Sequence, residues 1–230
     1  MTDFHAHVLP RMDDGSKSLE ESKELLISTC AQGIDVICAT PHFDSNIESA
    51  DSFLKRRAAA HTALSESCAG LQIPRLVLGA EVSFFVGMSG NDELSSLCIG
   101  GSRCLLIEMP YFTWTAGIRT EIYSLSTNLS LIPILAHIER YPEFSSDDKL
   151  ADLFEIGALL QINAEAFAFT RTRKRALELF KSGLCVLGSD CHGIKRRPQN
   201  MGAAAAVIEK ALGAKRSADI FSRCDELLGT

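Results

Sequence analysis

The chain has 230 residues, of which 46% are hydrophobic and 23% charged, and this composition is typical of a globular protein and excludes intrinsic disorder. The net charge of −6 argues against non-specific binding to nucleic acid or to an acidic membrane surface. No apolar run approaches the length of a membrane span, and the first residues do not resemble a signal peptide. We therefore expect a cytoplasmic protein without membrane insertion, folded as a single domain over residues 1–230.

Short apolar or β-branched runs alternate along the chain with longer helical patterns. The apolar runs predict seven strands, which are Thr2–His7, Asp35–Thr40, Leu76–Val82, Cys104–Met109, Leu131–Ala136, Ala158–Asn163 and Leu184–Ser189.

The helical patterns lie between these runs. In the first one, Ser18 and Glu21 form a predicted capping box, and Gly33 is a suitable residue for ending the helix. The other helices are predicted at Ala50–Cys68, Ala116–Ser126, Asp147–Ile156, Thr172–Ser182, Met201–Leu212 and Ser217–Leu228.

Strict alternation of strands and helices predicts an α/β fold with parallel strands and right-handed crossovers. This pattern fits either an open doubly wound sheet or a barrel. An open nucleotide-binding sheet requires a glycine-rich loop after its first strand, but this strand ends in His5-Ala6-His7. A seven-unit (β/α) barrel fits better, because a barrel brings all its strand ends to one place.

The eight cysteines are too sparse for a disulfide scaffold and include no Cys-x-x-Cys pair. Cys30, Cys38, Cys104 and Cys185 lie among apolar residues and are expected to fill the core as thiols. The six histidines differ, because only His61 lies in a polar helical stretch. The other five lie beside Asp, Glu or another His where an apolar run ends.

Acidic side chains and histidines follow six of the seven predicted strands. His5 and His7 are two positions apart on one strand, so their side chains point the same way. A single Glu or His in such a place is usually solvated or hydrogen-bonded, but independent surface residues would scatter over both ends of the strands. The candidate ligands are His5, His7, Asp14, His42, Glu81, Glu108, His137, Asp190 and His192.

Imidazole and carboxylate ligands without thiolates favour Mn²⁺, Fe or Zn²⁺. Nine candidates suggest two or three divalent ions, with Glu81 as a bridging ligand. Such clustered ions are suited to phosphoester hydrolysis. Arg140 follows His137 closely, and Arg196 and Arg197 follow His192, so we expect guanidinium groups to bind phosphate beside the ions.

The ordered set of motifs resembles the PHP (polymerase and histidinol phosphatase) superfamily. A narrower similarity is to bacterial PHP-type protein tyrosine phosphatases, and it is carried by the stretch His5–Pro10, the turn Asp13-Asp14-Gly15 and the stretch Ala136–Tyr141. These phosphatases are encoded with capsule and exopolysaccharide assembly systems. The motifs continue with Thr40-Pro41-His42, Gly79-Ala80-Glu81, Ile107-Glu108 and Ser189-Asp190-Cys191-His192, so the resemblance spans residues 1 to about 200.

This resemblance implies a distorted (β/α)₇ barrel with three metal ions, often Mn²⁺. By position it implies one ion on His5, His7, Glu81 and Asp190, a second on Glu81, Glu108 and His137, and a third on Asp14, His42 and His192. It also implies that Arg140 and Arg197 bind phosphate during metal-assisted hydrolysis. The implied substrate is phosphotyrosine in the C-terminal tail of a cognate bacterial tyrosine autokinase.

Substrate preference remains open in the sequence. The segment 43–48 lacks the glycine–aromatic pattern expected after His42, and it could line the substrate entrance. The alternative substrate is a small phosphomonoester such as histidinol phosphate. The net charge of −6 and the lack of a basic, aromatic-rich stripe disfavour a nuclease. The complete set of ligands and arginines disfavours a non-catalytic binding module.

A rival mechanism is suggested by Cys191, since Cys191 and Arg197 match the Cys-x₅-Arg spacing of cysteine-dependent tyrosine phosphatases. We reject it because His192, Lys195 and Arg196 are too bulky for a loop that cradles phosphate with its backbone. Cys191 also alternates with Asp190 and His192, so its side chain is expected to point away from theirs.

Overall fold

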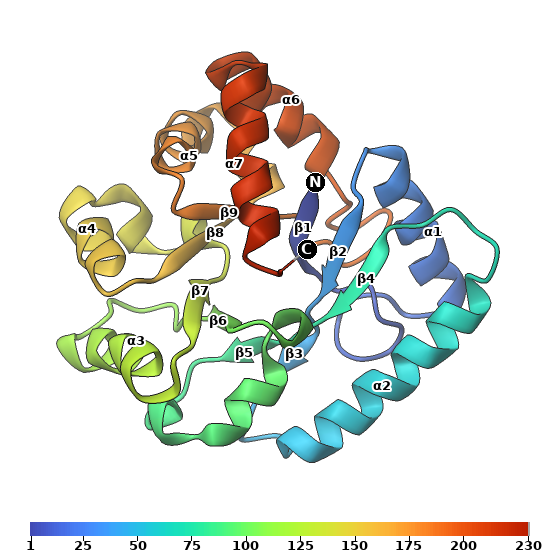
Figure 1. The fold of residues 1–230 in the computed structure, drawn as a ribbon, viewed down its shortest axis with the longest axis horizontal. Helices are drawn as coiled ribbons and strands as arrows, with labels where there is room; N and C mark the ends of the chain where they lie inside the picture. Colours follow the sequence, from blue (N-terminus) through green and yellow to red (C-terminus); the bar gives the residue numbers. More distant parts are fainter. Residues whose placement is uncertain (230) are drawn as a thin grey trace.

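Parallel strands form a ring surrounded by helices in the computed structural model, which describes residues 1–229 (Figure 1). One sheet has the order β1-β2-β4 and the other the order β3-β5-β6-β7-β8-β9. The strands are β1 (Thr2–Ala6), β2 (Val36–Ala39), β3 (His42–Phe43), β4 (Arg75–Leu78), β5 (Glu81–Ser83), β6 (Cys104–Glu108), β7 (Ile132–Leu135), β8 (Leu159–Asn163) and β9 (Cys185–Gly188).

The ring closes where the first strand meets the last. The backbone N–H of Asp190 donates to the carbonyl of His5 at 2.7 Å, and the N–H of His7 donates to the carbonyl of Cys191 at 3.0 Å. Together with a parallel bridge between Ala6 and Cys191, these bonds join the end of β1 to the residues just after β9. The closure places the end of β1 directly beside the residues that follow β9.

The two sheets also join at a kink. The prediction of one continuous strand over Leu76–Val82 was wrong here. This segment is divided into β4 and β5, and β3 was not predicted as a strand. Hydrogen bonds still cross the break, because the N–H of Gly79 donates to Ala39 and that of Glu81 donates to Pro41, at 2.9 and 3.0 Å. The sheets are therefore parts of one distorted ring, in which β2 with β3 and β4 with β5 stand in the places of two of the seven predicted strands.

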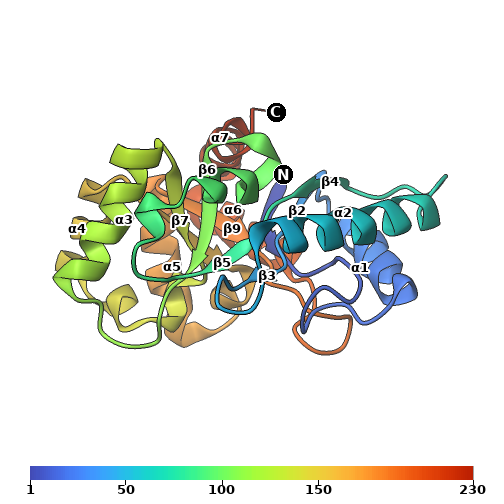
Figure 2. The ribbon, with the colours of Figure 1, turned by 90° about the horizontal axis from the view of Figure 1, so that it is seen from below.

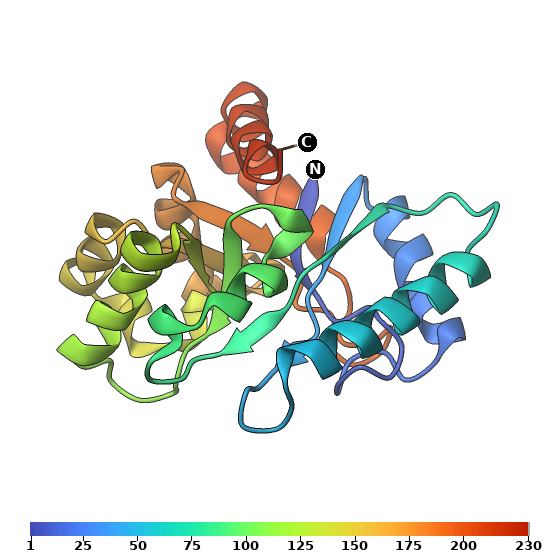
Figure 3. The same cartoon turned by 60° about the horizontal axis from the view of Figure 1, so that its bottom comes forward.

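Seven α-helices cover the outside of this ring in the described part of the chain, and Figure 3 shows α1 and α2 beside β1, β2 and β4. They are α1 (Leu19–Ala31), α2 (Ala50–Ser67), α3 (Ala116–Leu129), α4 (Asp147–Glu155), α5 (Thr170–Ser182), α6 (Met201–Leu212) and α7 (Ala214–Glu226). Short 3₁₀ helices lie at Met88–Gly90, Asp92–Leu97, Ile99–Gly101, Ile138–Arg140, Pro142–Ser145 and Ala164–Phe167.

Helix α1 begins where the sequence predicts. The Ser18 hydroxyl accepts from the backbone N–H of Glu21 at 3.2 Å, which satisfies one free donor of the first turn. The return bond of the predicted capping box shifts by one residue, because the Glu21 carboxylate accepts from the N–H of Lys17. Gly33 follows the helix end with a positive φ of 77°.

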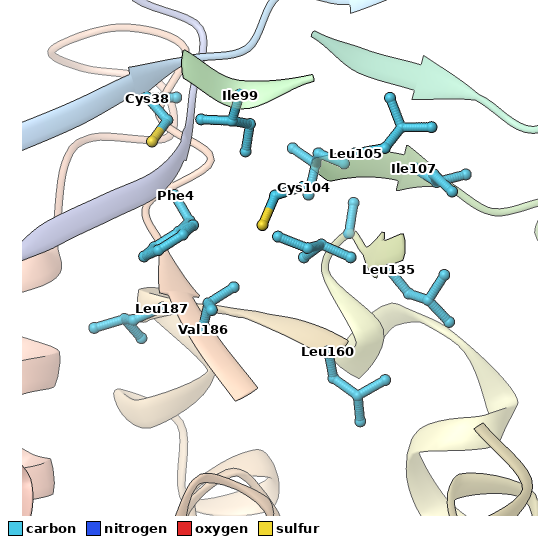
Figure 4. Packing of buried hydrophobic residues seen from close by; sticks show 14 of the residues in the cluster. Phe4, Cys38, Ile99, Cys104, Leu105, Ile107, Leu135, Leu160, Val186 and Leu187 are labelled. Atoms are coloured by element: carbon cyan, nitrogen blue, oxygen red, sulfur yellow. The ribbon is translucent and has the colours of Figure 1, made fainter. Parts of the chain in front are cut away.

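Apolar side chains from neighbouring strands pack together inside the ring (Figure 4). Phe4, Cys104 and Val186 come from three different strands and are essentially inaccessible to solvent. The cysteines are free thiols, and Cys38, Cys104 and Cys185 are buried as predicted. Cys30 is only partly buried, so its prediction as a core residue was wrong.

The loops that follow the strands lie on one side of the molecule, opposite the chain ends (Figure 2). This arrangement is the general consequence of parallel strands in a ring, and it directs all the strand-end side chains toward one face. Within the described residues, every helix is too short or too polar to cross a bilayer.

Gly188 is a point at which two neighbouring strands approach β9 closely. An added Cβ would lie 2.7 Å from both the Cβ of His5 and the Nε2 of Gln161. We expect Gly188→Ala to lower the free energy of unfolding by about 1–3 kcal/mol, because the packed neighbours must move. Urea denaturation followed by circular dichroism measures this loss.

Gly117→Ala is the matched control for this substitution. Gly117 lies in α3, and its added Cβ would meet no atom beyond the helix nearer than 3.7 Å. Alanine also has the higher helix propensity, so this variant should be neutral or slightly stabilised. Equal stability of the two variants would contradict the close packing around Gly188.

Candidate metal centre

The end of β1 directs two imidazoles into the ring. The Nε2 atoms of His5 and His7 lie 3.0 Å apart, and both side chains are fully buried. The Nδ1 of His5 donates to Gln161 Oε1 at 2.9 Å, and that of His7 donates to Asp13 Oδ2 at 2.7 Å. Each ring uses Nδ1 for this bond, so the Nε2 atoms, the other nitrogen of each ring, face the same small volume.

A buried carboxylate lies at the centre of the cluster. Glu81 Oε2 is 3.1 Å from His5 Nε2, 3.2 Å from His7 Nε2 and 3.1 Å from His42 Nδ1, and Glu81 Oε1 is 3.0 Å from His137 Nε2. Despite these neighbours, Oε2 accepts no hydrogen bond within the described residues. A buried acceptor without a donor is costly, and a cation would satisfy both this oxygen and the facing nitrogens.

The charge state of Glu81 agrees with this interpretation. Burial favours the neutral acid, but the nearby imidazoles of His5, His137 and His7 outweigh it and hold the pKa of the Glu81 carboxyl well below its usual range. The carboxylate is therefore ionised and available as a ligand with two oxygens.

The remaining candidates complete three groups of donor atoms. Asp14 Oδ1 is 3.2 Å from His192 Nε2 and 3.6 Å from His42 Nε2, and Glu108 Oε1 is 3.7 Å from His137 Nε2. The sets whose donor atoms could hold one ion are His7 with Asp14, His42 and His192; His5 with His7 and Glu81; and His42 with Glu81 and Glu108.

All nine predicted ligands thus lie in one cluster, but the grouping differs in detail from the sets that the resemblance implies. His7 joins the group of Asp14, and His42 faces Glu81 as well as Asp14. Asp190 Oδ1 lies 3.6 Å from His5 Nε2 and 3.5 Å from His7 Nε2, close to the group of His5, His7 and Glu81 but outside it. His137 also lies outside the three groups, although it contacts Glu81.

Two arginines reach the same cluster from its open side. Arg140 Nη2 is 2.6 Å from Asp190 Oδ2, and Arg197 Nη2 bonds to the same oxygen. A second nitrogen of Arg197 lies 2.9 Å from His192 Nε2. Their side chains are 31% and 29% exposed, so both guanidinium groups face solvent at one edge and the ligand cluster at the other. Arg196, the third predicted cation, is exposed and has no ion pair within the described residues.

Sequence reasoning missed the amide side chains of β8, which was the one strand without an acidic or histidine end. Gln161 Oε1 accepts from His5 Nδ1 and, at 2.7 Å, from the backbone N–H of His137. Gln161 Nε2 donates to Asn163 Oδ1 at 2.8 Å, and Asn163 Nδ2 donates to Asp190 Oδ2 at 2.9 Å. Polar residues two positions apart in an otherwise apolar strand were the signal that could have revealed them.

Strained backbone is concentrated at the site. His137, Asp190 and Arg197 have positive φ angles of 33°, 51° and 53°, a conformation that side chains with a Cβ seldom adopt. Gly15 shows a related constraint, because an added Cβ would lie 2.4 Å from the carbonyl oxygen of His7. The surrounding contacts hold these positions against a local cost, which is typical of functional sites.

Cys191 does not share the properties of a nucleophile. Its side chain is fully buried, and burial raises the pKa of the thiol to about 12. A catalytic cysteine requires a thiolate near neutral pH and an accessible sulfur. The burial of Cys191 therefore agrees with the prediction that its Cys-x₅-Arg spacing is coincidental.

The family model for capsular polysaccharide synthesis, CpsB/CapC, matches residues 1–228. The chain belongs to this family. Tyrosine-protein phosphatase CpsB of Streptococcus pneumoniae is 30% identical over 96% of this chain and 95% of its own length. Tyrosine-protein phosphatase YwqE of Bacillus subtilis is also 30% identical, over 94% of this chain and 86% of its own.

Solved structures agree with this assignment. A chain from the crystal structures of YwqE and CpsB, described as unique metal-dependent tyrosine phosphatases, matches the CpsB/CapC chain with a TM-score of 0.85 and 26% identity. The match covers 99% of this chain and 94% of that one. The phosphotriesterase homology protein of Escherichia coli matches with a TM-score of 0.55 and 8% identity, which shows a shared fold alone.

Asp13 offers a test of how the candidate centre is supported. We expect Asp13→Asn to weaken Mn²⁺ binding by about 10- to 100-fold, because the carboxylate that orients His7 and increases its basicity is lost. Calorimetric titration of the metal-stripped protein measures the affinity. The control is Asp51→Asn, since Asp51 is exposed on α2 and pairs with Lys55. Unchanged affinity in Asp13→Asn would contradict this supporting role.

Proposed function

We propose that this CpsB/CapC chain is a cytoplasmic, metal-dependent protein-tyrosine phosphatase that acts in capsule or exopolysaccharide synthesis. The observation that carries the proposal is Glu81 Oε2, which has no hydrogen-bond donor among the described residues and lies within 3.2 Å of three imidazole nitrogens. Arg140 and Arg197 lie beside this cluster on its open side. Together these groups fit a cation and a phosphate as neighbours.

The proposed ligands are those identified from the sequence, and they would hold two or three divalent ions. Mn²⁺ is our first choice, with Fe and Zn²⁺ as the alternatives, because the donors are imidazoles and carboxylates without a thiolate. Glu81 would bridge two of the ions, since its two oxygens face different histidines. Gln161 and Asp13 accept hydrogen bonds from the imidazoles of His5 and His7 and orient them in the way that metal sites require.

Divalent ions bound here would activate water and neutralise negative charge on a phosphoryl group. The protein's own contribution is orientation. Asp190 Oδ2 bonds to both Arg140 and Arg197 and holds the two guanidinium groups side by side, with other N–H donors available to phosphate oxygens. A phenolate is a good leaving group that needs little help from a protein acid.

The proposed substrate is phosphotyrosine in the C-terminal tail of a bacterial tyrosine autokinase. Two lines of support favour a protein substrate. The relatives CpsB and YwqE are named tyrosine-protein phosphatases, and the family is assigned to capsular polysaccharide synthesis. The arginines are also partly exposed rather than enclosed, which suits a phosphate presented on a polypeptide.

A substrate panel with Mn²⁺ tests this function. We expect efficient hydrolysis of a phosphotyrosine peptide and much slower hydrolysis of the matching phosphoserine peptide and of histidinol phosphate. EDTA should abolish the activity, and His5→Ala should lower it by about 10³-fold, because the ions supply several kcal/mol of stabilisation. His61→Ala, on the outer helix α2, is the matched control and should keep full activity. Equal rates on all three substrates would overturn the tyrosine assignment.

Cys191→Ala separates the metal mechanism from a thiol mechanism. The variant should retain the activity of the wild-type protein, because the buried thiol is protonated and lies outside the proposed ligand set. Alanine is preferred to serine here, since it does not bury a hydroxyl group. Kinetics and metal content are measured on the same preparation. Loss of activity in Cys191→Ala with the metals retained would contradict the metal mechanism and favour the thiol mechanism.

A further inference from the structure

The loops around the metal centre differ in composition: those on one side are apolar and those on the other are basic. Exposed apolar side chains follow the adjacent strands β3, β5 and β6, and they are Ile47, Val86, Tyr111 and Phe112. The loop segments 44–49, 84–91 and 109–115 contain neither lysine nor arginine. This side of the centre therefore offers apolar surface without competing positive charge.

The opposite side carries the cations. Arg140 follows β7, Arg171 follows β8, and Arg197 follows β9, so the three lie after the adjacent strands at the other end of the same sheet. Two exposed apolar side chains, Phe169 and Ile194, also lie in the loops after β8 and β9, but here they accompany basic residues. A phosphate that bonds to Arg140 and Arg197 would approach from this side.

Tyr111 lies beside the metal centre, between the apolar loops and the basic loops. Its hydroxyl donates to Glu108 Oε1 at 3.1 Å and lies beside the Arg140 guanidinium. Its ring is nearly parallel to that of His137, with 10° between the planes and 6.4 Å between the centroids. Tyr111 is nevertheless 61% exposed, so much of its side chain is open to a ligand.

Two buried aromatic residues support the Tyr111 side chain. Its ring centroid is 5.3 Å from that of Tyr141, which in turn is 5.2 Å from that of Trp114. Tyr141 is only 3% exposed, and its hydroxyl accepts from the backbone N–H of Met109 at 3.0 Å. Because this support is rigid, a ligand ring that packs on Tyr111 would not have to order the side chain first.

We infer that Tyr111 recognises the aromatic ring of the phosphotyrosine and so selects aryl phosphates over alkyl phosphates. This inference rests on the proposed function and deepens it. When the phosphate bonds to Arg140, the attached ring leaves the centre past the exposed face of Tyr111. Aromatic pairs with centroids 4.5–7 Å apart gain attraction beyond simple burial, and a serine phosphate has no ring to provide it.

The kinetics of Tyr111→Ala test this contact. We expect KM for p-nitrophenyl phosphate and for a phosphotyrosine peptide to rise about five- to tenfold, because the stacking partner of the substrate ring is removed. Inorganic phosphate, used as a competitive inhibitor, has no ring, so its inhibition constant should change by less than about twofold. Tyr111→Phe keeps the ring and should keep KM for both esters well below that of Tyr111→Ala.

Tyr123→Ala is the matched control, because Tyr123 is an exposed aromatic residue on the outer helix α3 and should not affect any of these constants. An equal rise in KM and in the phosphate inhibition constant would overturn the inference, since Tyr111 would then only support Arg140 or Glu108. An unchanged KM in Tyr111→Ala, or a KM in Tyr111→Phe as high as in Tyr111→Ala, would overturn it as well. Failure of the wild-type protein to hydrolyse phosphotyrosine would instead reject the proposed function itself.

Discussion

The buried negative charge of Glu81 is the constraint on which the site depends. A carboxylate removed from water is costly unless positive charge or donors surround it. Here four imidazoles approach its two oxygens from three strands: His5 and His7 from the end of β1, His42 from β3 and His137 from the loop after β7. These strands are distant in sequence, and only a closed ring of parallel strands brings their carboxyl ends to one point. The barrel fold is therefore what brings the histidines to the buried Glu81.

A layer of neutral and acidic side chains lies behind the ligands and determines their geometry. Asp13 and Gln161 fix two imidazole rings, while Asn163 joins Gln161 to Asp190. Asp190 itself has a positive φ, a conformation that costs of order 1–3 kcal/mol in most settings. The hydrogen-bond network offsets this cost, because it leaves few polar groups at the site without a partner. Removing one member should therefore affect several others.

Much of this arrangement could be predicted from the sequence, because parallel strands with polar residues at their ends leave few alternatives. The alternation of apolar runs predicts the ring, and the positions of the histidines predict the ligand cluster. The kink at Gly79 could not be predicted, since it depends on how β4 and β5 fit two neighbours at once. Gln161 was missed for another reason: a neutral amide in a strand gives no charge signal, and its role becomes visible only through its partners. The pairing of Asp190 with two arginines likewise depends on tertiary contacts.

The seam between the first and last strands has a consequence for how the protein is assembled. His5 and His7 lie on one side of this seam and Asp190 on the other, joined by the backbone bonds that close the ring. An ion bound by residues on both sides of the seam would stabilise the closed ring, because binding to one form of a protein stabilises that form by mass action. During synthesis, the last strand emerges long after the first, so the complete ligand set exists only once most of the chain has been made. Metal acquisition would then be a late folding step.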